Sequence, residues 1–190
     1  MKLTFNIDNH STDRSMKRPF ESLTAQEALH VAIFIEERNA QIYQQFSELF
    51  AEFRDPDSLQ IAQVFWDMAE EERRHGTMLQ ERYFDRYGTQ SCAVTEEDIR
   101  ELIEVPKIDN GEFFAIARAR ISHRPADKAL QIALDAEIAA QRFYKRVESQ
   151  TSDPDLKKLY AELADFEDNH TDFLQKKLAE APTPPSSDQA

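Results

Sequence analysis

The chain has 190 residues, and its 36 acidic against 23 Lys and Arg side chains give a formal net charge of −13. This balance argues against binding to nucleic-acid backbones, which require a basic face. One cysteine, Cys92, excludes a disulfide within the chain. No apolar run approaches the roughly 18–20 residues that span a bilayer, and the N-terminus has no signal-peptide core. We therefore expect a cytoplasmic protein without a membrane span.

Strong helix formers dominate the chain, and only three glycines are present. The length suits one domain with a substantial core. We expect residues 1–21 to form a flexible arm, residues 22–180 a single all-α domain, and the proline-containing residues 181–190 a disordered tail.

Apolar residues at helical spacing predict four long helices in this domain. Thr24 and Glu27 form a candidate capping box at the first helix, while Pro56 and Gly88 suit the start and the end of the second. Residues 88–124 are an insertion, in which short helices are expected from near Thr95 and over about residues 112–121. The four long helices are expected over residues 24–53, about 56–87, 125–149 and 154–180.

Two motifs place a Glu and a His three residues apart, Glu72 with His75 and Glu167 with His170. Three residues of helix turn through about 300°, so both side chains of a motif leave the same helix face. A carboxylate and an imidazole that project together can bind one metal ion. A single motif arises easily by chance in a Glu-rich helix, whereas a second copy in a matching context does not.

The matching context is the helix before each motif, which carries a Glu and a Tyr seven residues apart. These pairs are Glu36 with Tyr43 and Glu137 with Tyr144. The domain is therefore an imperfect repeat of a two-helix unit. The tyrosines are either outer hydrogen-bonding or redox partners of a metal site, or ordinary core residues.

All four glutamates fall where the helical pattern requires apolar core residues. Buried carboxylates without partners are unfavourable, and four of them together also repel one another. Two divalent cations would compensate the charge and two neutral imidazoles would complete the coordination, as in di-iron carboxylate bundles. The candidate metal-ligating and catalytic residues are Glu36, Glu72, His75, Glu137, Glu167 and His170.

The two motifs suggest one metal ion held by Glu72 with His75 and another by Glu167 with His170, with the remaining two glutamates between or beside the metals. Glu71 also lies four residues before His75. The repeat, however, aligns Glu71 with a phenylalanine, so Glu72 is the preferred ligand. For the same reason Glu36 is preferred over Glu37, which aligns with an isoleucine.

The two Glu–Tyr pairs and the two Glu-x-x-His motifs together resemble those of the ferritin-like superfamily, and within it those of the rubrerythrin-type di-iron domains. The resemblance covers roughly residues 24–180. The stretch from Met68 to His75 and the insertion after Tyr87 look most like the ferritin-like domain of bacterial membrane-bound ferritins, without their membrane domain. The resemblance implies a ferritin-like four-helix bundle of two helix-pair repeats with a helical insertion between them. It also implies two iron ions as cofactor, with manganese or a mixed pair as the alternatives.

The function implied by the resemblance is oxidation of ferrous iron with oxygen or hydrogen peroxide, in iron homeostasis and protection from oxidative stress. This would be an enzyme, a di-metal oxidoreductase of the ferroxidase or peroxidase type. Rubrerythrins carry an additional Glu one helical turn from the ligand that Glu137 matches, whereas the flanking turns here hold Leu134 and Ala140. No rubredoxin module follows in the sequence. Both departures favour the ferroxidase.

Other functions and the assembly stay open. A rubrerythrin-like peroxidase or a manganese catalase would use the same ligands, and a non-catalytic iron-sensing or interaction module would bind metal without turnover. We expect a homodimer or a larger homo-oligomer. An isolated two-helix unit cannot close such a site, so a dimer that exchanges such units between chains is an alternative to four helices in one chain. The sequence does not decide whether helix pairs are exchanged between chains.

Overall fold

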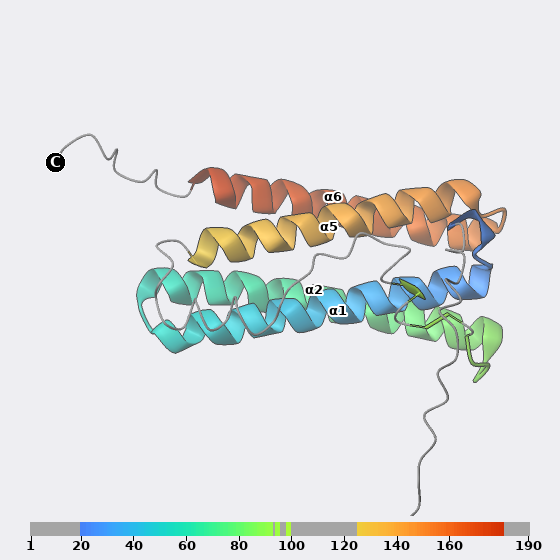
Figure 1. The fold of residues 1–190 in the computed structure, drawn as a ribbon, viewed down its shortest axis with the longest axis horizontal. Coiled ribbons are helices and arrows are strands. Elements are labelled where there is room, and N and C mark those ends of the chain that lie inside the picture. The colour runs from blue at the N-terminus through green and yellow to red at the C-terminus, as the bar shows by residue number, and fades with distance from the viewer. Residues whose placement is uncertain (1–19, 93, 96–97, 100–124, 181–190) are drawn as a thin grey trace, which may run out of the picture.

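The computed structural model describes residues 20–92, 94–95, 98–99 and 125–180. Four long helices lie lengthwise beside one another as an all-α bundle (Figure 1), which confirms the predicted fold class. After the short helix η1 (Phe20–Ser22), they are α1 (Ala25–Phe53), α2 (Pro56–Tyr87), α5 (Pro125–Gln150) and α6 (Pro154–Glu180). Among the described residues, no helix is both long and apolar enough to cross a membrane.

The helix ends form where local sequence signals place them. Thr24 and Glu27 make the expected capping box at the start of α1, each side chain bonding to the other residue's backbone N–H. Asp55 caps α2 by accepting a hydrogen bond from the backbone of Ser58. Gly88 ends α2 with a φ of 59°, a conformation that side chains with a Cβ rarely adopt.

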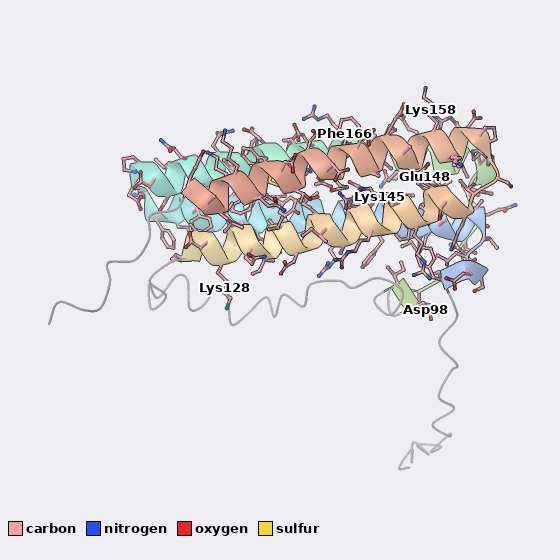
Figure 2. The ribbon with its side chains drawn as sticks, turned by 90° about the horizontal axis from the view of Figure 1, so that it is seen from above. Asp98, Lys128, Lys145, Glu148, Lys158 and Phe166 are labelled. Atoms are coloured by element: carbon pink, nitrogen blue, oxygen red, sulfur yellow. The ribbon has the colours of Figure 1, made fainter. Side chains whose placement is uncertain are left out.

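The bundle consists of two helix pairs, in agreement with the sequence repeat. α1 packs along α2 and α5 along α6 (Figure 1), each pair joined by a tight turn. Arg86 near the end of α2 bonds to Asp153, which also accepts hydrogen bonds from the first backbone N–H groups of α6. This ion pair fixes the end of one helix pair against the other. Charged side chains such as Lys145 and Lys158 project outward from α5 and α6 (Figure 2).

The apolar core is divided into two clusters along the bundle. The first packs around Leu29, Tyr144 and Leu163, and the second around Phe46 and Phe65. In each of the four helices a short buried polar stretch separates the residues of one cluster from those of the other. The polar layer in the middle of the bundle holds the candidate metal ligands.

Several predictions concern residues outside the described part of the chain. These are nearly all of the arm over residues 1–21, most of the insertion, and the tail over residues 181–190. At the start of the insertion, Thr95 and Asp98 bond to each other's backbone N–H groups, the pattern of a helix start.

Candidate metal centre

All four helices contribute to one polar layer between the two apolar clusters. The four glutamates in this layer are fully buried, and its two histidines are 9% and 8% exposed. Each helix delivers its ligand candidates from its buried face, as the helical spacing requires. The structure thus brings together all six predicted residues: Glu36 from α1, Glu72 and His75 from α2, Glu137 from α5, and Glu167 and His170 from α6.

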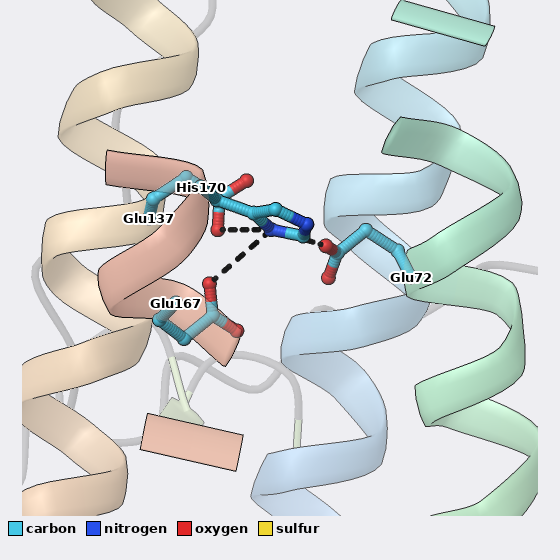
Figure 3. Close-up of side chains that lie close together, drawn as sticks. All are labelled: Glu72, Glu137, Glu167 and His170. Atoms are coloured by element: carbon cyan, nitrogen blue, oxygen red, sulfur yellow. Dashed lines mark ion pairs between the residues drawn. The ribbon is translucent and has the colours of Figure 1, made fainter. Parts of the chain in front are cut away.

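One group of potential ligands surrounds His170. Ligand atoms of Glu72, Glu137, Glu167 and His170 all lie within 4.8 Å of one another, and these side chains converge from three helices (Figure 3). The His170 Nδ1 atom lies 3.3 Å from Glu72 Oε1 and 3.6 Å from Glu137 Oε2. This nitrogen therefore faces the position at which a metal ion would be held.

A second group lies beside it and includes Glu36, Glu72 and His75, again with ligand atoms within 4.8 Å of one another. The His75 Nδ1 atom lies 3.4 Å from Glu36 Oε2. Because Glu72 belongs to both groups, it would be available as a ligand at either metal position. Glu36 and Glu137, which the sequence left between or beside the metals, lie next to the imidazoles of His75 and His170.

The ligand candidates carry buried polar atoms that no described residue satisfies. Both carboxylate oxygens of Glu72 and of Glu167, and the Nδ1 atoms of His75 and His170, have no hydrogen-bond partner in the described part of the chain. One carboxylate oxygen of Glu36 and one of Glu137 are likewise buried without a hydrogen-bond partner among the described residues. Unsatisfied buried carboxylates are unfavourable. Oxygen and imidazole donors suit divalent iron or manganese, so the donor set fits a pair of such ions.

Without metal, two of the carboxylates in this layer, Glu72 and Glu167, favour their protonated form. Burial raises the pKa of Glu72 and of Glu167 well above 4.5, and the neighbouring carboxylates raise it further. Burial lowers the pKa of His170, but the nearby carboxylates of Glu137 and Glu72 outweigh this and raise it to about 11. Burial likewise raises the pKa of Glu137, yet its contacts with Glu167 and His170 and the hydrogen bond from Tyr43 leave it lowered. Protons thus hold the place that metal cations would take.

Two buried tyrosines hold the carboxylates beside the imidazoles. The Tyr43 hydroxyl on α1 donates to Glu137 on α5 at 2.5 Å, and the Tyr144 hydroxyl on α5 donates to Glu36 on α1. Burial raises the pKa of both phenols well above 10, and nearby carboxylates add to the effect, so both remain protonated donors. Each tyrosine therefore orients a carboxylate of the other helix pair while also packing in the core.

Glu71 has a role that spacing alone did not reveal. Its carboxylate Oε2 lies 2.8 Å from His170 Nε2, on the side of the ring away from the ligand group. Its side chain is 46% exposed, whereas that of Glu72 is fully buried. This agrees with the choice of Glu72 as the ligand. The one signal in the sequence was the mismatch of the repeat at Glu71.

A pocket of about 340 Å³ opens between α1 and α2 and reaches Glu72. Ala40 and Gly76 are its small lining residues. A hydrogen bond of 2.6 Å between Gln80 and Glu37 joins α1 and α2 at one side of the pocket. The other lining residues are Gln41, Gln44, Arg73 and Thr77. The pocket thus extends from the surface toward the fully buried Glu72.

Gly76→Met is expected to fill this pocket and to slow metal entry on the order of 10-fold. Gly76→Ala is the matched control, since an added Cβ would lie 3.5 Å from Glu36 Cβ, an ordinary contact. It should also stabilise α2 by about 1 kcal/mol through helix propensity. Uptake of Co²⁺, followed by its visible absorption in stopped flow, measures entry. Equal uptake rates in both variants would show that metal enters elsewhere.

A family model for rubrerythrin matches residues 27–178, which include nearly all of the four helices and all six candidate ligands. The chain belongs to the rubrerythrin family. A solved structure of an uncharacterised conserved protein from Magnetospirillum magnetotacticum MS-1 has the same fold, with a TM-score of 0.67 and 24% identity. The match covers 87% of this chain and 100% of that chain. No curated protein matches the chain. A rubrerythrin domain implies a di-metal site, usually of iron, and the buried cluster fits that expectation.

Proposed function

We propose that this rubrerythrin domain is a di-iron oxidase of the ferroxidase type, which oxidises Fe²⁺ with oxygen or hydrogen peroxide. The observation that carries the proposal is the pair of adjacent ligand groups that share the buried, unsatisfied carboxylate of Glu72. Glu36 and His75 would hold one iron, Glu137, Glu167 and His170 the other, and Glu72 both. Two ferrous ions supply the two electrons that reduce peroxide to water or oxygen to peroxide.

The chain's own residues would prepare this chemistry in three ways. Tyr43 orients the carboxylate of Glu137, and Tyr144 orients that of Glu36. Fixed carboxylates need less reorganisation when the charge of the metal centre changes. The apolar clusters on both sides exclude water from the layer. The pocket between α1 and α2 admits small reactants to Glu72.

The surroundings of Glu137 favour a ferroxidase over a peroxidase of the rubrerythrin type. Leu134 and Ala140, the α5 residues nearest to the expected position of an additional carboxylate, are 7% and 2% exposed and apolar. α5 thus offers no further ligand one turn from Glu137. The homo-oligomeric assembly and the cytoplasmic location stay predictions.

The test is stopped-flow oxidation of anaerobic protein loaded with two Fe²⁺ per chain, mixed with either oxygen or peroxide. The proposal predicts rapid, saturable oxidation that repeats when more Fe²⁺ is added. A single slow, stoichiometric oxidation would indicate a non-catalytic iron-binding module. Peroxide consumption by the Mn²⁺-loaded protein, without oxidation of added Fe²⁺, would indicate a manganese catalase. Absence of saturable metal binding would refute the metal centre altogether.

A further inference from the structure

The two-helix repeat is broken at one position next to the metal centre. Each Glu-x-x-His motif is preceded by one residue that should occupy the same place in both halves. In α2 this residue is Glu71, and in α6 it is Phe166. The repeat thus places a carboxylate at one copy of the motif and an aromatic ring at the other.

Glu71 acts on the histidine of the opposite helix pair. Its carboxylate lies 2.8 Å from His170 Nε2, while His170 Nδ1 faces the carboxylates of the ligand group (Figure 3). A metal ion bound at Nδ1 leaves Nε2 protonated, and this N–H donates to Glu71. A carboxylate on the far nitrogen of a ligating imidazole fixes its tautomer and orientation and makes it a stronger donor.

His75 has a phenylalanine where His170 has a carboxylate. Its ring lies against that of Phe166, on α6 about midway along the bundle (Figure 2), with 4.8 Å between ring centroids and an interplanar angle of 37°. Within the described residues, the one carboxylate at ion-pair distance from His75 is Glu36, which faces Nδ1. The aromatic contact packs the ring but accepts no proton in the way a carboxylate does.

The two ligand groups also differ in their number of members, and the larger group is the one that contains His170. The His170 group has four members and the His75 group has three, with Glu72 counted in both. The pocket that reaches Glu72 is lined by α1 and α2, the helices that carry Glu36 and His75. More ligands and an imidazole bonded to Glu71 therefore lie at one position, whereas the other has fewer ligands and is built on the two helices that line the pocket.

From these differences we propose that the two metal positions are inequivalent, and that Glu71 is the positioning residue that makes them so. The position at His170 retains its divalent ion, whereas the position at His75 binds more weakly and exchanges its ion through the pocket. The inference rests on the proposed di-metal function and adds to it a division between a resident ion and an exchanging substrate ion.

Titration of the metal-free protein with Mn²⁺ tests this without any turnover. Electron paramagnetic resonance of free Mn²⁺, with calorimetry in parallel, should resolve two steps that differ at least 10-fold in affinity. Glu71→Ala should weaken the tight step by about 10–100-fold, the usual effect of removing such a partner, and leave the weak step unchanged. In Glu71→Gln the amide oxygen can still accept a hydrogen bond from His170 Nε2. The affinity of its tight step should therefore lie between those of the wild type and Glu71→Ala. The half-exposed position of Glu71 lets both variants fold.

The reciprocal variant is Phe166→Glu, which restores the symmetry of the repeat by adding a carboxylate beside His75. It should tighten the weak step and bring the two affinities together. Asp165→Ala, an exposed neighbour on α6, is the control for the loss of a surface charge and should change neither step. Two equal steps in the wild type, or equal weakening of both steps in Glu71→Ala, would overturn the inequivalence while leaving the di-metal centre intact. Absence of Mn²⁺ binding in the wild type would overturn the centre itself, and this inference with it.

Discussion

Glu72→Gln is expected to remove stoichiometric metal binding while leaving the helical bundle folded. The glutamine keeps the volume of the side chain but can no longer bridge two cations as an anion. Because Glu72 belongs to both ligand groups, a single substitution should weaken both metal positions. We expect the loss in affinity to exceed the 10–100-fold effect of removing an outer hydrogen-bond partner. Oxidation of Fe²⁺ should fall by a similar factor.

The same variant should be more heat-stable than the wild type when both are free of metal. Glu72 is fully buried and its pKa is raised by burial and by the neighbouring Glu36 and Glu137, so a neutral amide avoids the cost of either protonating this carboxyl group or burying its charge. Metal titration and thermal melts with and without Mn²⁺ measure both effects. Glu81→Gln, on the exposed surface of α2, is the control. Undiminished binding of two ions by Glu72→Gln would refute the assignment of the shared ligand.

The metal-free wild type is expected to lose thermal stability as the pH rises from about 6.5 to 9, and divalent metal is expected to restore it. The pKa of His170 rises from 6.5 in the unfolded chain to about 11 in the fold. The stabilisation that follows is fully present below pH 6.5 and is lost as the pH rises toward 11. The raised pKa values of Glu72 and Glu167 act in the same direction from pH 4.5 upward. The lowered pKa of Glu137 stabilises the fold above pH 4.5, and this contribution is lost only on acidification.

Thermal melts at about pH 6, 7.5 and 9, in chelator or in excess Mn²⁺, measure this dependence. One kcal/mol corresponds to about 2–4 °C for a domain of this size, so we expect a fall on the order of 5 °C in chelator. Metal at 100 times its dissociation constant adds about 2.7 kcal/mol, enough to reverse that fall. His170→Gln should flatten the curve above pH 6.5. A metal-free melting temperature that rises with pH would contradict the prediction.

The sequence predicted the helices well because their ends carry strong local signals. The capping box at Thr24, the proline at position 56 and Gly88 all lie at helix ends, as predicted. The repeat also predicted which of two adjacent glutamates faces the core. Glu36 and Glu72 are buried in the polar layer, whereas Glu37 is exposed and Glu71 is half-exposed.

Contacts between helices were beyond the reach of the sequence. Spacing within a helix shows which side chains share a face, but not how far one helix is rotated or shifted along another. The membership of Glu72 in both ligand groups, the contact of Glu71 with His170 and the pocket at Gly76 all depend on that rotation and shift. They became visible only when the helices were placed side by side.

A helical bundle ordinarily opens first at its frayed ends, but this one has its least apolar layer halfway along its length. When the ions are absent, the weakest part of the molecule is therefore its centre, where four helices meet around charged groups. Supply of metal would then decide how rigid the middle of the protein is, and how readily a protease finds an opened segment there. In this way the lifetime of the protein would follow the availability of the ion that it handles.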